Sequence, residues 1–312
     1  MTIYKYLNEE GAIATIKDNT VLLRTPPEYN DPFDCVFHIS EKERKKAYKL
    51  LVNYEYFKAI YNECVIANKQ YVLGKCNTKL LKTNLNVLAN TIRANKKYKF
   101  DPYISFHYKV GKILTGKSVD SYWDDFNKIV DEVLENVRHM ILLSCFSFNY
   151  DSILMWSHYA KSHFGACVKY EIDDDNFKPI HYSKKPINFK ISKLLEIKFG
   201  HEFAGAEMDY KDEAFLFALK PFLNKYIDWQ YEDEIRCAYS INIPNSRIHE
   251  VIINKNEKAL ALDMPAKIQA VYLGYNATDE FIDKVKKSCG KIPLFKMEKG
   301  KQKYLLIPTK LD

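Results

Sequence analysis

Residues 3–24, which read IYKYLNEEGAIATIKDNTVLLR, predict a strand, a helix and a second strand in that order. The first part, Ile3–Leu7, is short, apolar and aromatic, as strands commonly are. Asn8 can cap a helix, and Glu9–Glu10 then fall in its first turn, where the helix dipole favours acidic side chains. Thr20–Arg24 is rich in strand-forming residues. This alternation of strand and helix places the chain in the α/β or α+β class.

The alternation continues along the chain, so we expect a single domain covering residues 1–312. Its core would be a mixed β-sheet, either continuous or split into separate sheets. Apolar residues recur at helical spacing over much of the region from about 41 to 140, which predicts a helical insertion there. Ser121 would cap the last helix of that insertion. We expect further strands at Ile141–Phe148, Ala166–Ile172, Pro179–Tyr182, Asp228–Ile243, Lys267–Tyr275, Pro293–Met297 and Tyr304–Pro308. We expect further helices at Ser152–His163, with Gly165 ending the helix, at about Phe203–Tyr226, and at Thr278–Cys289.

Composition and charge narrow the range of functions. The chain has 312 residues, 47% of them hydrophobic and 28% charged, and its net charge is +7. This mild positive excess permits contact with nucleic acid or with an anionic cofactor but requires neither. No apolar run approaches the roughly 20 residues that cross a bilayer, and the N-terminus lacks the pattern of a signal peptide. We therefore expect a soluble, cytoplasmic protein with no membrane partner.

The cysteines argue against a disulfide framework and against a zinc knuckle. There are seven of them, an odd number, and no two form a CxxC pair. Most stand in apolar runs, where cysteine commonly serves as a small buried hydrophobic residue. We expect no bound metal.

The strand expected at Asp228–Ile243 carries the sharpest chemical signal. Because side chains alternate between the two faces of a strand, Glu232, Glu234 and Arg236 would share one face, together with Gln230. Paired carboxylates push each other's pKa apart, which suits acid–base catalysis or stabilisation of a developing cation. Arg236 would hold one carboxylate in place or bind a phosphate. The alternative is a solvent-facing sheet surface whose charges pair across strands.

A second candidate site joins the end of a buried strand to the helix that follows it. Ser147 stands at the strand end, where scaffolds often place functional groups, and the helix carries His158 and Tyr159. His158 and His163 are five residues apart, so they do not share a metal as an i, i+4 pair does. A Ser–His nucleophile pair would lack the GxSxG elbow. In the alternative interpretation Trp156 and Tyr159 are core anchors, and the histidines are hydrogen-bonded residues that fill space.

The loop Tyr29–Asp34 is a third candidate, since its prolines, aspartates and asparagine exclude regular structure. Asn30 and Asp31 would either bond the local backbone or present polar groups to a ligand. The first strand offers a weaker candidate surface, formed by Tyr4, Lys5 and Tyr6. It is weaker because strands with the sequence Tyr-Lys-Tyr are common.

Taken together, these stretches resemble a bacterial family, domain-of-unknown-function family twenty-nine seventy-one. The matching segments span most of residues 3 to 240, and their combination and order are specific although each is short. The region 42–117 has no counterpart in the resemblance. The family's name records no activity, so the resemblance implies membership and not chemistry. It rests on Tyr4-Lys5-Tyr6, Tyr29–Asp34, Cys145-Phe146-Ser147, Met155–Ala160, His163-Phe164-Gly165 and Trp229–Arg236.

The chain is also similar to ADP-ribosyltransferases, which open with a strand, a helix and a strand and carry Glu/Gln-x-Glu on a late strand. Glu232-Asp233-Glu234 fits that late motif, and Gln230-Tyr231-Glu232 fits it in a second register. On the first strand, Lys5 or Tyr6 stands where those enzymes have His or Arg. The resemblance implies an enzyme that cleaves NAD as a co-substrate and passes ADP-ribose to a macromolecular acceptor, nucleic acid or protein.

The same resemblance implies roles for individual residues. Glu234 would be the main catalytic carboxylate, as the last residue of Glu-x-Glu, while Glu232 orients the acceptor and Arg236 pairs with a glutamate or a phosphate. A bacterial enzyme of this kind would fit toxin or phage-defence biology. The cofactor-binding residues would be Tyr4, Lys5, Tyr6, Asn30, Asp31, Ser147, His158 and Tyr159.

Two other functions would use the same features. The carboxylates would serve a nucleic-acid processing enzyme or hydrolase with Mg²⁺, for which Asp31 and Asp34 would supply further oxygen ligands. A non-catalytic binding module is the other alternative, because aromatic residues make up 14% of the chain and include 23 tyrosines, which suit stacking on bases and protein contacts. Release of nicotinamide from NAD would favour the transferase, and metal-dependent cleavage of a nucleic-acid strand would favour the processing enzyme. Neither activity would favour the binding module.

Overall fold

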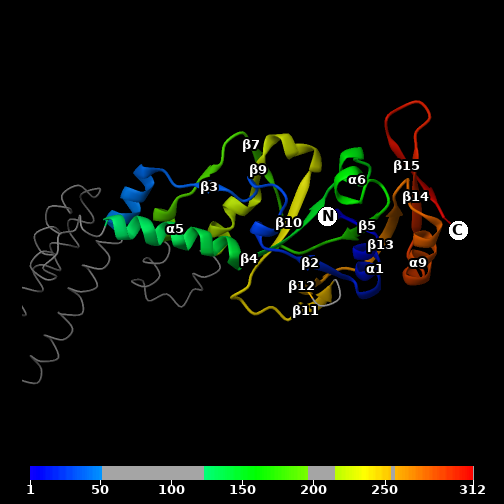
Figure 1. Cartoon of the computed structure of the whole chain (residues 1–312), viewed down its shortest axis with the longest axis horizontal. Coiled ribbons are helices and arrows are strands. Elements are labelled where there is room, and N and C mark those ends of the chain that lie inside the picture. Colours follow the sequence, from blue (N-terminus) through cyan, green and yellow to red (C-terminus); the bar gives the residue numbers. More distant parts are fainter. Residues whose placement is uncertain (51–122, 196–214, 254–256, 312) are drawn as a thin grey trace, which may run out of the picture. The chain divides into compact units, whose positions relative to one another are not determined.

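The computed structural model describes residues 1–50, 123–195, 215–253 and 257–311 (Figure 1). The chain divides into two compact units. The first comprises Met1–Val36, Glu135–Ile187 and Leu219–Asp312, and the second comprises Phe37–Leu134 and Asn188–Ala218. The single domain with an insertion at about 41–140 stays a prediction, because most of that insertion, including the proposed cap Ser121, lies outside the described residues.

An eight-stranded sheet forms the core of the first unit, in the order β15-β14-β13-β5-β1-β4-β10-β6 (Figure 1). Neighbouring strands run antiparallel except β13 and β14, which are parallel. This mixed sheet with its helices confirms the predicted α/β or α+β class. The strands are β1 (Thr2–Leu7), β4 (Ile141–Ser147), β5 (Ala166–Glu171), β6 (Phe177–Pro179), β10 (Glu234–Ser240), β13 (Ile268–Leu273), β14 (Leu294–Lys299) and β15 (Leu306–Lys310).

Apolar side chains cover both faces of this sheet. On one face, α1 (Glu9–Asp18) and α9 (Asp279–Cys289) contact each other and share a core with strand residues such as Ile3. On the other face, Tyr4 packs in a second core beside α6 (Ile153–Tyr159). Because successive strand residues point to opposite faces, β1 contributes to both cores.

Side-chain caps fix where three helices of the first unit begin, and the cap at Asn8 confirms the sequence prediction. The Asn8 side chain accepts a hydrogen bond from Gly11 N at 2.8 Å at the start of α1. Ser152 caps α6 and Thr278 caps α9 in the same way. Each cap satisfies a backbone N–H group that has no partner within the helix. Of the helices in the described ranges, none has the length and apolar character to cross a bilayer.

Two smaller sheets complete the first unit. One has the order β11-β12-β2, where β2 (Thr20–Leu23) is the predicted second strand and β11 (Ile248–Ile253) and β12 (Glu257–Asp263) have no predicted counterpart. In the other, β7 (His181–Ser183) pairs in parallel with β9 (Asn224–Tyr226). Short 3-10 helices lie at η1 (Pro26–Glu28), η3 (Lys220–Leu223) and η4 (Ile227–Glu232).

The helix expected at about Phe203–Tyr226 is wrong at its end. Residues 215–218 are helical, but η3 and β9 follow, and residues 203–214 lie outside the described part of the chain. Pro221 lacks the backbone N–H that a continuing α-helix would use, so the helix ends before it.

The strand predicted at Asp228–Ile243 is also wrong in its first half. Ile227–Glu232 forms the 3-10 helix η4, and β10 begins only at Glu234. Asp233 separates them in the left-handed conformation, with φ at 42°. Aspartate tolerates that conformation better than most residues, and this turn replaces the strict alternation that the sequence suggested.

Gly165 does not end a helix as the sequence suggested. Helix α6 ends at Tyr159, and Lys161, Ser162 and His163 then take three successive left-handed conformations. Gly165 follows where two backbones meet, because an added Cβ would lie 2.0 Å from the carbonyl oxygen of Leu7. The glycine is therefore required by close approach and not by helix termination.

The described part of the second unit is helical and has its own core. Residues 41–50 are helical, and α5 (Trp123–Met140) enters this unit through its residues up to Leu134. Arg44 and Asp131 form an ion pair at 2.5 Å. Strand β3 (Phe37–His38) precedes the first helix, and β8 (Ile187–Asn188) spans the boundary between the units in the chain. Buried core residues are Ile39, Ala47, Phe126, Val130 and Phe189.

Candidate functional site

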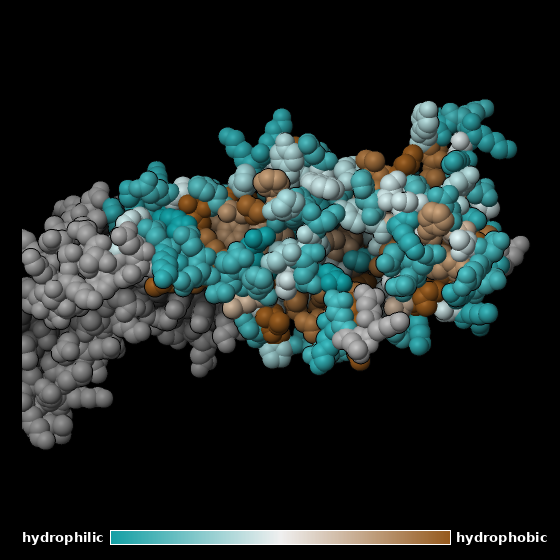
Figure 2. Space-filling view, in the orientation of Figure 1, coloured by the Kyte–Doolittle hydropathy of each residue, from teal (hydrophilic) through white to brown (hydrophobic). Residues whose placement is uncertain are grey.

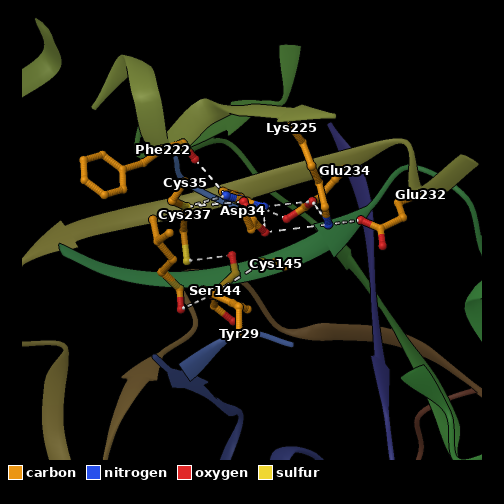
Figure 3. Close-up of polar contacts among 12 residues, drawn as sticks. Tyr29, Asp34, Cys35, Ser144, Cys145, Phe222, Lys225, Glu232, Glu234 and Cys237 are labelled. Carbon is orange, nitrogen blue, oxygen red and sulfur yellow. Dashed lines mark hydrogen bonds and ion pairs between the residues drawn. The ribbon is translucent and has the colours of Figure 1, made fainter. Parts of the chain in front are cut away.

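Five charged side chains are buried together in the first unit, and we call them the charged cluster (Figure 3). They come from the loop after η1, from β9, from the end of η4 and from β10. Each keeps between 0% and 6% of its surface exposed, so a solvent-facing sheet surface is excluded here. Burial of charged groups is costly unless they pair, and these groups pair with one another. The cluster consists of Asp34, Lys225, Glu232, Glu234 and Arg236.

Arg236 is the most completely bonded member of the cluster. Its Nε donates to Glu234 Oε1 at 2.6 Å, and its Nη2 donates to Asp34 Oδ2 at 2.7 Å. Its Nη1 donates to the carbonyl oxygen of Phe222 at 2.9 Å and contacts Cys35 Sγ at 3.1 Å. Burial alone would lower the pKa of Arg236, but Glu234 together with other neighbours, including Asp34, outweighs burial and keeps the guanidinium charged. Of the two predicted roles, the structure therefore has Arg236 holding carboxylates.

Glu234 is held ionised by the two cations. Besides Arg236, Lys225 Nζ donates to Glu234 Oε2 at 3.1 Å. Burial would raise the pKa of Glu234, yet Arg236 and Lys225 together bring this pKa well below its ordinary value. Both carboxylate oxygens are occupied, and the backbone N–H donates to the Tyr182 hydroxyl at 2.8 Å. Glu234 is thus a fixed negative charge in the interior.

Glu232 differs from Glu234 in its ionisation. Its Oε2 accepts from Lys225 Nζ at 2.5 Å, and its Oε1 accepts from the Tyr159 hydroxyl at 2.5 Å. Burial raises the pKa of Glu232 to about 7, because Lys225 only partly offsets burial and the charge on Glu234 adds to it. Two carboxylates two residues apart therefore differ in protonation near neutral pH.

Lys225 joins these carboxylates from β9. Its Nζ also lies 3.8 Å from Asp34 Oδ2 and 4.9 Å from the centre of the Trp229 ring. Although burial would lower the pKa of Lys225, Glu234 and Glu232 raise it, so the ammonium stays charged. In Figure 3 the lysine side chain reaches between the two glutamates. Lys225 was not among the residues predicted from the sequence, where its only signal is a lysine within the mostly apolar and aromatic run Phe222–Tyr226.

Ser147 supports the site from within. It pairs with Glu234 across β4 and β10, and its side chain is fully buried. The hydroxyl donates to the carbonyl oxygen of Glu232 at 2.6 Å and accepts from Asn149 N at 3.0 Å. Its hydroxyl is thereby used to hold the end of η4 in place.

An aromatic layer lies next to Glu232 towards solvent. Tyr159 is half-buried, and the exposed His158 lies with its ring centre 6.3 Å from the rings of both Tyr159 and Tyr231. The Tyr231 ring in turn lies 6.0 Å from Trp229. These rings belong to α6 and η4, and the Tyr159 hydroxyl connects them to Glu232.

The first-strand candidates point into the core. Lys5 Nζ donates to Ser144 Oγ and to the Cys145 carbonyl oxygen, each at 2.8 Å, and burial lowers the pKa of Lys5. The Tyr6 hydroxyl donates to the carbonyl oxygen of Asn149 at 2.9 Å. Tyr4 is buried with its ring 5.3 Å from that of Tyr150. These side chains therefore position β4 and the segment after it.

The loop Tyr29–Asp34 reaches the cluster through residues other than the two predicted. Asn30 is exposed, and Asp31 Oδ1 accepts from Phe33 N at 2.9 Å in a local turn. Asp34 instead bonds Arg236, whose guanidinium carbon lies 5.8 Å from the centre of the Tyr29 ring. For Asp31 the structure thus matches the turn interpretation, and the role of Asn30 stays a prediction.

Within the described ranges, no group of three or more His, Cys, Asp and Glu side chains has an arrangement that would hold a metal ion. Comparisons with family models, with curated proteins and with solved structures found no match to this chain. The resemblances to domain-of-unknown-function family twenty-nine seventy-one and to ADP-ribosyltransferases stay predictions.

Proposed function

We propose that this chain is an ADP-ribosyltransferase-like enzyme that cleaves NAD and transfers ADP-ribose to a macromolecular acceptor. One observation carries the proposal: Glu232 and Glu234 lie two residues apart in one buried network, and their pKa values are displaced in opposite directions. Glycosyl transfer needs a carboxylate that stabilises a cationic sugar and can also take up a proton near neutral pH. A group with a pKa of about 7 meets that need.

Glu232, and not Glu234, is assigned the reacting role. Both oxygens of Glu234 accept from the cations Arg236 and Lys225, whereas one oxygen of Glu232 accepts from the neutral Tyr159 hydroxyl of the aromatic layer. In the proposed step the bond between the ribose carbon and nicotinamide breaks, and nicotinamide leaves with the electron pair. The ionised Glu232 stabilises the sugar cation, an acceptor lone pair forms the new bond, and the acceptor proton passes to Glu232.

The rest of the cluster keeps Glu232 in place and sets its charge. Lys225 and Tyr159 each bond one of its oxygens, and the Ser147 hydroxyl holds its carbonyl group. Asp34, Glu234 and Arg236 form the fixed ion pairs behind it. Preorganised charges of this kind need no rearrangement when charge develops on the substrate.

Nicotinamide release from NAD tests the proposal, measured by chromatography with nucleic-acid and protein acceptors added in turn. Glu232→Gln keeps the shape and removes the charge, so turnover should fall about a hundredfold or more while the fold is retained. Glu257→Gln is the matched control, because Glu257 is exposed on β12 and should leave turnover unchanged. Full activity of Glu232→Gln would contradict the role of Glu232. Absence of NAD binding and cleavage by the wild type would contradict the transferase altogether.

A further inference from the structure

A groove separate from the charged cluster lies at the tip of the β14–β15 hairpin, the projecting red loop in Figure 1. Its volume is about 770 Å³, within the range of sites that hold a small molecule. One wall is the hairpin segment 299–306, and the other contains Ile153 of α6, His163 and the Tyr275–Asn276 loop.

The charge that lines this groove is positive. Lys299, Lys301 and Lys303 contribute to it, and no aspartate or glutamate does. Among the described residues, no carboxylate forms an ion pair with any of these three lysines, and all three are exposed. Figure 2 shows hydrophilic residues over the projecting tip, with hydrophobic residues directly beneath it. The groove therefore attracts an anion that also has an apolar surface.

Two tyrosine rings supply that apolar contact. Tyr304 is fully exposed at the tip, with a relative exposure of 103%, and Tyr275 is 39% exposed. Lys299 Nζ lies 4.4 Å from the centre of the Tyr275 ring, so one cation and one ring already lie together. An exposed aromatic ring beside lysines is the arrangement on which single-stranded nucleic acids stack.

The opposite wall is rigid and neutral. Asn276 N donates to the His163 carbonyl oxygen at 3.0 Å, and a Cβ added to Gly274 would lie 2.0 Å from that oxygen. The Ser157 hydroxyl donates to Ile153 O at 2.9 Å, so the His163 Nε2–H donates to Ser157 Oγ at 3.0 Å. Burial and the nearby Lys299 lower the pKa of His163, which leaves the positive charge of the groove to the lysines.

We propose that this groove binds a nucleotide unit, with the flat base against Tyr304 and Tyr275 and the phosphate beside Lys301 and Lys303. The proposal is independent of NAD cleavage, because no member of the charged cluster lines the groove. The nucleotide unit has two sources, a single-stranded nucleic acid and a free nucleotide, which share this chemistry.

Fluorescence anisotropy of a labelled oligothymidine, titrated with the full chain at several salt concentrations, tests the charged half of the proposal. The double variant Lys301→Gln/Lys303→Gln should bind at least about tenfold more weakly, and its salt dependence should fall by about one phosphate contact per lysine. The double variant Lys287→Gln/Lys291→Gln makes the same charge change outside the groove and should bind as the wild type does. Equal binding by the two double variants would overturn the proposal.

The aromatic half is tested at Tyr304. Tyr304→Ala should weaken binding by about fivefold or more, whereas Tyr304→Phe keeps the ring and should bind normally. Competition by unlabelled AMP and ATP would assign the groove to free nucleotides, and competition by oligothymidine alone would assign it to the polymer. Either result supports the nucleotide unit. Inorganic polyphosphate competing as well as oligothymidine, an unaffected Tyr304→Ala, or no binding by the wild type would overturn it.

Discussion

Glu232 has a pKa near neutral because of how many charges are buried around it. The cluster holds three carboxyl groups and two cations, which leaves one negative charge without a cationic counterpart. Glu234 bonds both Arg236 and Lys225, whereas Glu232 has Lys225 as its one cationic partner in the cluster and shares it, so the surplus falls on Glu232. A proton on Glu232 cancels that surplus, and loss of the proton restores a negative charge beside the Tyr159 hydroxyl. In our proposal this is the charge that faces the substrate.

At this single residue we predict a pH dependence of nicotinamide release. If ionised Glu232 is required, turnover should rise with pH through about 7 and then level off. The Tyr159 hydroxyl stabilises the ionised form, so Tyr159→Phe should move the midpoint to higher pH while the plateau rate changes little. Identical pH–rate profiles for the wild type and Tyr159→Phe would show that Tyr159 does not influence the pKa of Glu232.

Trp156 provides a prediction about stability instead of chemistry. Its side chain is fully buried, its ring meets that of Tyr6 at 5.3 Å, and its Nε1 donates to Tyr150 O at 2.7 Å. Trp156→Ala should lower the free energy of unfolding by roughly 3–5 kcal/mol, measured by urea denaturation. Trp156→Phe keeps a ring and should lose less. An unchanged free energy of unfolding combined with lost ligand binding would show instead that Trp156 contacts a ligand.

Among the elements, the junction of η4 and β10 shows what the sequence could predict and why the rest was hidden. A strand was predicted, and Glu232, Glu234 and Arg236 do meet, but Glu232 arrives through a 3-10 turn and a left-handed Asp233. Acidic spacing is visible in the sequence, whereas Lys225 comes from a separate strand, β9, that was predicted as helix. Partners that meet through tertiary packing leave no periodic signal.

At the level of elements we also predict the effect of a methyl group between β1 and the start of β5. In Gly165→Ala the new Cβ would meet the Leu7 carbonyl oxygen at 2.0 Å, and backbone atoms cannot move aside as a flexible side chain can. Unfolding free energy should fall by about 3 kcal/mol. Gly290→Ala is the control: its φ is +57° but open space surrounds it, so only the backbone conformation is strained. Its loss should be smaller, about 1–2 kcal/mol. If the two variants lost the same unfolding free energy, the contact with the Leu7 carbonyl oxygen would be relieved by a small backbone shift of low energetic cost.

For the whole molecule, the fold class could be predicted from the sequence, whereas the order of the strands in the sheet could not. Helix caps such as Asn8 and Thr278 act within a few residues, so the sequence predicts those helix starts correctly. The sheet order brings β1 between β4 and β5, across more than a hundred residues of chain, and β11–β12 lacks the alternation that marks strands. Long-range pairing of this kind is decided by packing of both sheet faces and not by local pattern.

For the whole molecule we predict that the free energy of unfolding depends on pH because of Glu232. The folded chain has a Glu232 pKa of about 7 against an ordinary value of 4.5, so between these values the unfolded chain releases the proton first. Stability therefore falls as pH rises through this window, by roughly 3 kcal/mol in total, and is level above it. His163, whose pKa is lowered by burial, acts in the opposite direction. The difference between Glu232→Gln and wild type isolates the effect.

Urea denaturation of both proteins at several pH values measures this difference. As pH rises from about 4.5 to 7, the free energy of unfolding of Glu232→Gln should increase relative to that of the wild type. Glu234 supplies the contrast, since its lowered pKa makes ionisation stabilising, and that stability is lost only as pH falls below 4.5. A constant difference across the window would mean that Glu232 titrates alike in the folded and unfolded chains.

The contact between Arg236 and Cys35 also has a consequence for chemical labelling. Cys35 is fully buried, and burial raises its thiol pKa well above the ordinary value; the same cause raises the pKa of Cys145 and of Cys237 to about 12. Thiols in that state react slowly with iodoacetamide until the surrounding structure opens. The rate at which peptides containing these cysteines become alkylated therefore reports how often the interior around Arg236 is exposed. Mass spectrometry measures this alkylation rate for each cysteine, and the measurement needs no substrate.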